Sequence, residues 1–271
     1  MIPYHAPTRD MQFVIEELAG LDEIAVLEAF REQEVGADLV AAVLEEAARF
    51  AGGVLAPLNR TGDQQPARLG EAGVETSPGF PEAYRQFVEA GWNGLNGPTE
   101  HGGQGLPELL SVAAHEMWNS ANLSFALCPL LTAGAIEALR QHGTPEQQRL
   151  YLSRLVSGEW TGTMNLTEPQ AGSDLSAIRT RAVPEGDHYR LHGQKIYITW
   201  GDHDVAENVI HLVLARTPDA PEGVKGISLF LVPKVMVNDD GTLGERNDVH
   251  CHTLEHKLGN HASPTCVMQY G

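Results

Sequence analysis

The chain has 271 residues, 42% of them hydrophobic, so it is long enough to fold as one large domain or two moderate ones. Acidic residues outnumber basic ones 36 to 18, which gives a formal net charge of −18. That charge argues against nucleic acid and anionic membrane surfaces as partners, because both would repel the chain. It does not exclude an anionic ligand, since backbone amides and helix N-termini bind phosphate groups locally.

The cysteine content and the first residues bear on the compartment. Three cysteines, Cys128, Cys251 and Cys266, are too few for a disulfide framework. Residues 1–10 contain two prolines, a histidine and an arginine, which is unlike a signal peptide. No apolar run approaches the roughly 20 residues that a bilayer span requires. We therefore expect a cytoplasmic protein without a membrane span.

The first 158 residues have a predominantly helical pattern. An acidic arm over 1–36 is expected to form two short helices, 11–18 and 21–30, either as a solvated decoration or as part of a subunit interface. Apolar spacing predicts further helices, at 37–60, 81–90, 109–119, 129–142 and 145–157. Thr144 and Gln147 form a capping-box pattern at the start of the last helix. The Gly-, Pro- and Gln-rich stretch 61–79 is predicted to be a surface loop.

The pattern changes after Gly158 to short runs of β-branched, aromatic and apolar residues separated by turn residues. These predict strands, at 160–166, 189–191, 195–200, 209–215, 227–232 and 266–269. With no alternating helices between them, the strands predict an antiparallel sheet, and 227–232 is expected to be buried. The last strand is followed by no closing turn, so we expect the chain to be a fragment of a longer protein.

The most specific stretch is 164–174, which reads M-N-L-T-E-P-Q-A-G-S-D. Thr167 is placed at the end of a strand, and Pro169 turns the chain away from it. Gly172 and Ser173 then offer small side chains and exposed amides that can approach a phosphate or the edge of a ring. A plain turn between two strands explains the same residues, so both interpretations stay open at this point.

A second motif follows at 193–199, G-Q-K-I-Y-I-T. T-E-P-x-A-G-S-D followed by G-x-K-x-(aromatic)-I-T resembles the acyl-CoA dehydrogenase family. The stretches 94–107 (G-L-N-G-P-T-E-H-G-G-Q-G-L-P) and 256–266 (H-K-L-G-N-H-A-S-P-T-C) also resemble family segments. The resemblance covers about residues 40–271. The arm 1–36 and the insertion 235–252 resemble a larger subgroup of the family, typified by 3-methylmercaptopropionyl-CoA dehydrogenase.

This resemblance implies an α+β fold. An N-terminal all-α helical domain (37–158) would be followed by an antiparallel β-barrel-like domain (159–271), with the acidic arm 1–36 in front. The C-terminal helical domain of the family would be absent from this chain. The resemblance also implies a homo-oligomer in the full-length form.

The resemblance implies FAD as cofactor, bound partly by the first motif. Met164, Leu166 and Thr167 would line the flavin, with the Leu166 backbone and the Thr167 hydroxyl at its pyrimidine edge. Gly172 and Ser173 would lie at the pyrophosphate, and Ser173 also near the acyl-CoA substrate.

The second motif would complete the FAD site. Tyr197 would pack on the flavin ring, Ile198 belongs to the same contact segment, and Thr199 would donate a hydrogen bond near N5. Two positions depart from the family pattern. The family usually has tryptophan where this chain has Tyr197, and glycine where it has Gln170, so the ring contact and the shape of the turn are expected to differ from the family pattern.

The reaction implied is αβ-desaturation of an acyl-CoA thioester, with electrons passed to an electron-transfer flavoprotein. The family's catalytic base is a glutamate in the C-terminal domain, so it is expected beyond Gly271 and no catalytic residue is assigned here. Glu168 is expected to order its turn. The chain alone is expected to bind FAD weakly and to show no turnover. Two alternatives stay open: an acyl-CoA oxidase, and a non-catalytic flavin- or acyl-CoA-binding module.

Two other motifs are better explained by structure than by ligand binding. Gly102, Gly103 and Gly105 follow no strand and lack the remainder of a phosphate-loop pattern, so a tight connecting loop is expected. The run 250–252 (H-C-H), with further histidines nearby, contains metal-ligand residue types. Neighbours in a strand point to opposite faces, so no metal site is expected.

Overall fold

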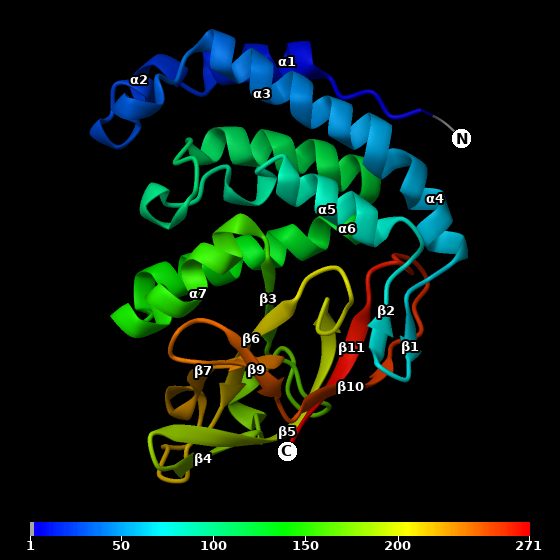
Figure 1. The fold of residues 1–271 in the computed structure, drawn as a ribbon, viewed down its shortest axis with the longest axis vertical. Helices are drawn as coiled ribbons and strands as arrows, with labels where there is room; N and C mark the ends of the chain where they lie inside the picture. Colours follow the sequence, from blue (N-terminus) through cyan, green and yellow to red (C-terminus); the bar gives the residue numbers. More distant parts are fainter. Residues whose placement is uncertain (1–2) are drawn as a thin grey trace.

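The structure is a computed structural model that describes residues 3–271. The helices gather on one side of the molecule and most of the strands lie below them, with the N-terminus on the helical side and the C-terminus among the strands (Figure 1). The fold class is therefore α+β, as predicted.

The N-terminal arm is helical but discontinuous. It contains α1 (Thr8–Phe13), a π-helical turn (Val14–Leu18), α2 (Leu21–Ala25) and a 3₁₀ turn (Glu28–Gln33). Met11, Ile15 and Leu21 are buried and belong to the main helical core. The expectation of a solvated decoration is therefore wrong for this face of the arm, because its apolar residues pack on the rest of the fold.

The next segment is longer than predicted. Helix α3 (Ala37–Phe50) runs through a π-helical turn (Ala51–Leu55) into α4 (Ala56–Gln64). The predicted loop 61–79 is only partly a loop, since α4 covers its first residues and a hairpin of β1 (Arg68–Gly70) and β2 (Gly73–Glu75) follows. Val74 of that hairpin packs into the core of the β region, which gives this short and otherwise polar segment its anchor.

Three helices complete the layer: α5 (Phe80–Glu89), α6 (Glu108–His142) and α7 (Pro145–Ser157). The capping box of Thr144 and Gln147 is confirmed, with both reciprocal hydrogen bonds formed. Helix α6 consists of two helical segments that meet at Asn122, whose backbone is not helical.

Asn122 explains where the second segment of α6 begins. Its Oδ1 accepts the Phe125 amide at 3.1 Å, as an N-cap does, and its Nδ2 donates to the Leu55 carbonyl at 3.1 Å. The predicted helix start at Pro129 is wrong, because Pro129 lies inside the helix.

The helical core is organised around the ring of Phe125. The rings of four aromatic residues have centroids within 6.4 Å of it, namely Phe50, Phe80, Tyr84 and Phe87. Trp200, which follows the fifth strand, also joins this core: its ring stacks on Phe80, and its Nε1 donates to the Ser124 carbonyl at 3.0 Å. Trp200 thus anchors the β region to the helices.

Helix α6 is the one helix within residues 3–271 whose length and composition would suit a membrane span. The expectation that no segment reaches this limit is thus wrong. In its most apolar window 56% of the residues are buried inside the fold, which is the behaviour of a core helix.

The β region contains nine strands within residues 159–271, and the predicted runs all fall on strands. They are β3 (Trp160–Asn165), β4 (Arg181–Glu185), β5 (His188–Thr199), β6 (Asn208–Ala215), β7 (Ser228–Pro233), β8 (Val235–Val237), β9 (Leu243–Arg246), β10 (Val249–Leu254) and β11 (Thr265–Tyr270). Two predicted runs merge into β5, and β4, β8, β9 and β10 were not predicted.

The strands form a four-stranded sheet in the order β10-β11-β5-β4, a three-stranded sheet β3-β6-β7 and the hairpin β8-β9. Strands β3 and β6 pair in parallel, so the prediction of a wholly antiparallel arrangement is wrong at this pair. The chain between them is long enough to form the β4-β5 hairpin and return in the same direction. The other pairs are antiparallel.

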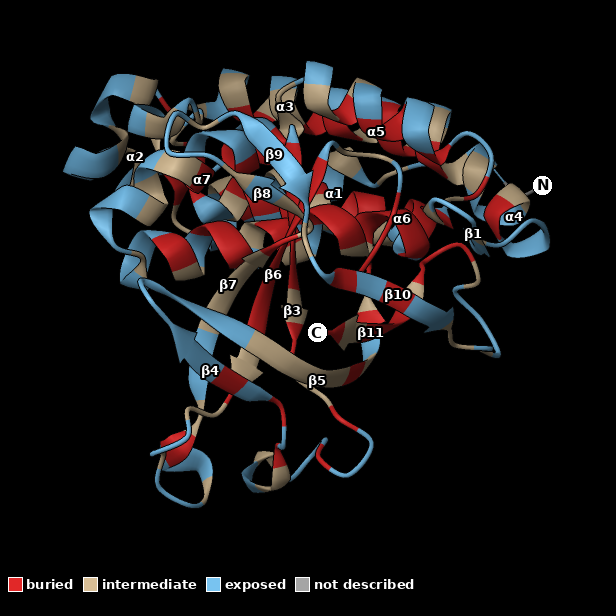
Figure 2. Cartoon of the chain, turned by 60° about the horizontal axis from the view of Figure 1, so that its bottom comes forward, coloured by how far each residue is buried: buried red, intermediate tan, exposed pale blue. Residues whose placement is uncertain are grey.

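The two larger sheets are joined at one edge and share a core. Ala182 donates to the Arg216 carbonyl at 2.8 Å, and the Arg216 amide donates to the Thr180 carbonyl at 2.9 Å. Figure 2 shows β6 buried, and most of β4 and the beginning of β5 exposed. The predicted burial of 227–232 is wrong, because β7 is an outer strand and its Leu229 is 49% exposed.

Candidate functional site

The structure brings the two sequence motifs side by side. The Ile196 amide donates to the Thr167 carbonyl at 2.9 Å, so the segment that leaves β3 runs along the end of β5. Within β3 itself, the Thr163 hydroxyl donates to the Thr199 carbonyl at 2.7 Å. Segments separated by about 30 positions in the sequence therefore share one surface, which we call the cradle: residues 164–174 and 195–199.

A β-bulge shapes the β5 side of the cradle. Opposite β11, Ile198 pairs with Cys266 and Lys195 pairs with Met268, so two residues of β5 oppose Val267 alone. Such a bulge bends a strand and redirects side chains. Tyr197 lies in it with φ +59° and is 60% exposed. A left-handed backbone at a non-glycine residue costs about 1–2 kcal/mol, and here it presents an aromatic face to solvent.

The predicted site residues differ in accessibility. Met164, Leu166, Thr167 and Thr199 are half-buried, and Gly172, Ser173 and Tyr197 are exposed. The side chain of Ile198 is 2% exposed and packs in the core of the β region. Any contact of Ile198 with a cofactor must therefore use its backbone.

The turn of the first motif is closed by its own backbone. Glu168 and Ala171 exchange two hydrogen bonds, from the Glu168 amide at 2.8 Å and from the Ala171 amide at 3.0 Å. Gln170, at the usual glycine position of the family, donates to Glu168 Oε2 at 2.6 Å and to the Ala177 carbonyl at 3.0 Å. The glutamine thus ties the turn to the following segment, and Gly172 and Ser173 remain on the exposed side.

Beneath the cradle lies a buried ion pair of Lys195 and Glu168. Their Nζ–Oε1 distance is 2.8 Å, and the side chains are 0% and 3% exposed. Lys195 Nζ also donates to the Leu166 carbonyl at 3.0 Å. Glu168 further accepts the amides of Arg179 at 2.7 Å and Thr180 at 3.0 Å. The expectation that Glu168 orders its turn is confirmed by these contacts.

Opposing effects act on the ionisation of this pair. Burial alone would raise the pKa of Glu168, but hydrogen bonds from Lys195, Thr180 and Arg179 outweigh it and bring the pKa down to about 2. Burial lowers the pKa of Lys195, and its contact with Glu168 offsets part of that shift. Because three groups besides Gln170 donate to the carboxylate, Glu168 is ionised at neutral pH and its charge favours the ammonium form of Lys195.

The residues of the cradle fit FAD by their chemistry. Thr167, Ser173 and Thr199 carry hydroxyls on half-buried or exposed residues, which can bind the polar edges and phosphates of the cofactor. The exposed Tyr197 ring offers a flat surface for an aromatic system. The Glu168 carboxylate points inward and is neutralised, so it presents no exposed charge that would repel phosphate.

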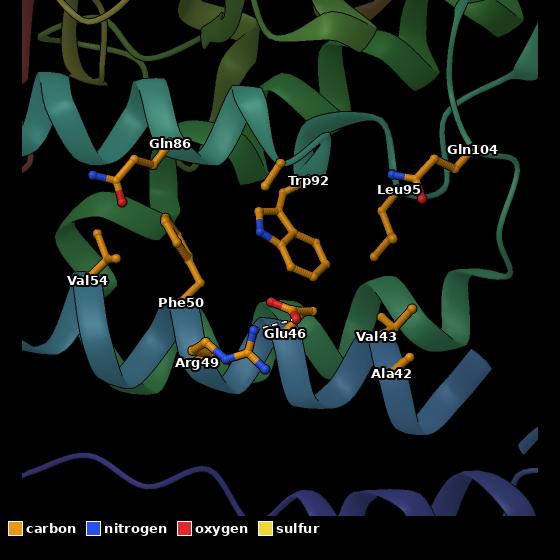
Figure 3. Close-up of a pocket in the computed structure, with 11 residues that line it drawn as sticks. Ala42, Val43, Glu46, Arg49, Phe50, Val54, Gln86, Trp92, Leu95 and Gln104 are labelled. Atoms are coloured by element: carbon orange, nitrogen blue, oxygen red, sulfur yellow. Dashed lines mark hydrogen bonds and ion pairs between the residues drawn. The ribbon is translucent and has the colours of Figure 1, made fainter. Parts of the chain in front are cut away.

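Two cavities elsewhere in the fold are lined by residues outside the cradle. One of about 550 Å³ lies between α3, α5 and the segment 92–104, where Trp92 lies between Phe50 and Leu95 (Figure 3). A second, of about 350 Å³, lies beside α4 and includes Arg60 and His261. The cradle is by comparison an open face of the β region.

The other two motifs behave as structural elements. Gly103 donates to the Pro98 carbonyl at 3.0 Å in a tight loop, and a Cβ there would lie 2.2 Å from the Gly97 backbone, which confirms the connecting-loop interpretation. In β10, Cys251 is buried while His250 and His252 are exposed, so the predicted alternation of faces is confirmed. Within residues 3–271 no three His, Cys, Asp or Glu residues lie together as metal ligands would.

Comparison with known proteins assigns the family. Residues 37–159 match the family model of the acyl-CoA dehydrogenase N-terminal domain, and residues 163–271 match that of the acyl-CoA dehydrogenase middle domain. The chain therefore belongs to the acyl-CoA dehydrogenase family.

Individual relatives agree with this assignment. The chain is 53% identical, over 98% of its length, to 3-methylmercaptopropionyl-CoA dehydrogenase of Ruegeria pomeroyi, of which it covers 45%. Butyryl-CoA dehydrogenase of Megasphaera elsdenii superposes with a TM-score of 0.67 at 26% identity, over 84% of this chain and 54% of that one. An acyl-CoA dehydrogenase of Bacillus anthracis solved with FAD has the same fold, with a TM-score of 0.67 at 24% identity over 85% and 35% of the two chains. The chain thus spans about half the length of these relatives or less.

Sequence reasoning did not identify Lys195 and Trp200 as site-forming residues. Lys195 stands within the second motif, and a lysine at an inward position of an apolar strand is itself a signal of a buried partner. Trp200 follows the motif directly, but its packing on the helices depends on the positive φ of 54° at that residue, which periodicity does not predict.

Proposed function

We propose that this chain provides the flavin-binding part of an FAD-dependent acyl-CoA dehydrogenase, which desaturates an acyl thioester between its α and β carbons. The single observation that carries the proposal is the cradle: two separated motifs lie side by side, with hydroxyl groups and an exposed aromatic ring on one surface. Membership of the family supports FAD as the group bound there.

Each residue of the cradle has a separate binding task. Met164, the Leu166 backbone and the Thr167 hydroxyl would hold the pyrimidine edge, and Thr199 would donate near N5. Tyr197 would cover the ring system and exclude water from it. When bound, FAD supplies the hydride acceptor for the β-hydrogen of the substrate. Ser173, with Gly172 leaving room beside it, would hold the pyrophosphate and face the acyl-CoA.

The α-proton requires a base that this cradle does not offer. Glu168 is the carboxylate within the first motif, but it is 3% exposed in its side chain and its pKa is about 2. A base with so low a pKa and with its oxygens occupied by donors is poorly matched to proton abstraction. We propose that the base lies outside the residues of this chain, since the chain covers only 45% of the Ruegeria pomeroyi relative and 54% of the Megasphaera elsdenii chain.

The substrate and partners follow by analogy with relatives. The name of the Ruegeria pomeroyi relative suggests 3-methylmercaptopropionyl-CoA or a similar short acyl-CoA as substrate. We propose an electron-transfer flavoprotein as electron acceptor and a homo-oligomer as the assembled state. Cys128, Cys251 and Cys266 are buried and unpaired with one another, which is compatible with the cytoplasmic location that we propose.

The experiment measures bound FAD and dye-linked oxidation of acyl-CoA. The 271-residue chain is expected to bind FAD weakly without turnover, and the longer protein is expected to reduce the dye with a short acyl-CoA. Thr167→Val should weaken FAD binding, whereas the control Thr61→Val on α4 should not. Hydrogen peroxide as the main product would instead indicate an oxidase, and FAD binding without turnover in the longer protein would indicate a binding module. Turnover by the 271-residue chain would contradict the placement of the base.

A further inference from the structure

We infer that Lys195 and Glu168 are positioning residues for the cofactor: their buried ion pair fixes the two halves of the cradle in the arrangement that receives FAD. The inference rests on the proposed function and extends it to two side chains that are buried beneath the exposed face of the cradle, with 0% and 3% exposure. Neither residue is assigned to the chemistry itself.

The contacts of the pair lead directly to the backbone of the cradle. Lys195 Nζ bridges Glu168 Oε1 at 2.8 Å and the Leu166 carbonyl at 3.0 Å, so a single ammonium group joins the β5 segment to two points of the first motif. The next residue, Ile196, donates its amide to the Thr167 carbonyl at 2.9 Å. Both side-chain and backbone hydrogen bonds therefore hold segment 166–168 against segment 195–196.

The carboxylate organises the far side of the turn. Glu168 Oε2 accepts the Arg179 amide at 2.7 Å and Gln170 Nε2 at 2.6 Å, and its Oε1 accepts the Thr180 amide at 3.0 Å. The exposed residues Gly172 and Ser173 lie within the loop that these bonds close. The orientation of that loop thus depends on one buried carboxylate.

The lysine also anchors β5 directly before the bulge that presents Tyr197. Lys195 points inward with 0% exposure, and the β-bulge begins at the next residue. Tyr197 is held outward at positive φ immediately after this anchored position. Loss of the buried lysine would remove the anchor that directly precedes the bulge from which Tyr197 is presented.

A second buried ion pair provides a matched control. Asp202 and Lys234 are 2.6 Å apart, and their side chains are 2% and 14% exposed. Asp202 accepts the Val74 amide at 3.2 Å, and Lys234 donates to the His203 carbonyl at 2.9 Å. Within residues 3–271 these contacts tie the β1-β2 hairpin to the loop after β5, and they include no residue of the cradle.

The test measures FAD affinity by flavin fluorescence and thermal stability by circular dichroism in the same samples. Lys195→Met leaves a buried carboxylate without its partner, so both FAD affinity and the melting temperature should fall. The double variant Glu168→Gln/Lys195→Met leaves no unpaired charge and keeps a side-chain oxygen that accepts the amides of Arg179 and Thr180, so it should recover most of the melting temperature. Its Kd for FAD should nevertheless stay at least ten-fold above that of the wild type. The control Asp202→Asn/Lys234→Met, which likewise keeps an acceptor for the Val74 amide, should change Kd by less than two-fold at temperatures where it is folded.

The outcomes separate this inference from the proposed function. If the wild-type chain binds no FAD, the proposed function is wrong and the inference falls with it. If the wild type binds FAD and the folded double variant binds it equally well, the pair is only structural and the inference alone is overturned. Should the double variant not fold, Glu168→Gln, which keeps the shape of the side chain, serves in its place, and an unchanged Kd would again overturn the inference.

Discussion

Acidification from pH 7 to pH 5 should destabilise the fold through two buried histidines. His203 and His211 are 1% and 0% exposed. His211 Nδ1 lies 3.1 Å from Asn165 Nδ2, which donates to it, so the proton of the neutral ring is on Nε2. His203 Nδ1 accepts the Val205 amide at 3.3 Å. Both rings are therefore held in the neutral form by the hydrogen bonds that they accept.

The magnitude follows from the pKa difference between the folded and unfolded chain. Burial, and secondarily the charge of Lys234, lowers the pKa of His203 to about 3, and burial lowers the pKa of His211 to about 3. In the unfolded chain each ring titrates near 6.5. The unfolded state thus binds protons between pH 6.5 and 3 that the folded state does not, so stability is lost as the pH falls through this window. At pH 5 the loss is about 2 kcal/mol for each histidine.

The assay is urea denaturation at pH 7 and pH 5, followed by tryptophan fluorescence. The wild type should lose about 4 kcal/mol of unfolding free energy, a large part of a typical domain stability of roughly 5–15 kcal/mol. His211→Phe keeps an aromatic ring in place and removes the group that titrates. It also removes the hydrogen bond that Asn165 donates to Nδ1, and this loss is the same at both pH values. In this variant the loss between pH 7 and pH 5 should fall to about 2 kcal/mol.

Ionisation of Glu168 does not affect the comparison between pH 7 and pH 5. Its pKa is lowered from 4.5 to about 2 in the folded chain, so the stability that its carboxylate provides is lost only as the pH falls below about 4.5. An equal loss of stability in the wild type and in His211→Phe would refute the reasoning, because it would show that His211 is not buried in its neutral form.

Three further variants test the helical layer by urea denaturation. Phe125→Ala empties the centre of the aromatic core and should cost about 3–5 kcal/mol, and a loss below 1 kcal/mol would contradict this packing. Thr144→Ala removes the capping box and should cost about 1 kcal/mol, whereas unchanged stability would mean that the cap is not formed. Gly103→Ala places a Cβ 2.2 Å from the Gly97 backbone and should cost about 2 kcal/mol or more, whereas the control Gly53→Ala meets no atom within 4 Å.

Local sequence signals predicted most helices because their determinants are local. The apolar stripe of α3 and the Thr144 cap act within a few residues of where they stand, so their elements form where predicted. Predictions failed where distant contacts decide the structure. The break in α6 depends on Asn122 reaching the Leu55 carbonyl, and the β1-β2 hairpin depends on Val74 packing among strands more than 100 residues later.

The parallel pairing of β3 and β6 illustrates the same limit for the sheets. Their residues have the composition of strands, but direction depends on the path of the chain through the β4-β5 hairpin, and no local pattern encodes that path. At the candidate site, the motifs predicted which segments meet. The inward direction of Lys195 and the positive φ of Tyr197 arise from the bulge against β11, so they became visible only in the structure.

The central claim is that 164–174 and 195–199 form one FAD-binding surface. Amide hydrogen exchange, measured by mass spectrometry with and without saturating FAD, tests it most directly. The account predicts that both segments gain protection together, while α3 and α5 around the 550 Å³ cavity are unchanged. Binding of FAD with protection at that cavity, or with protection of only one of the two segments, would contradict it.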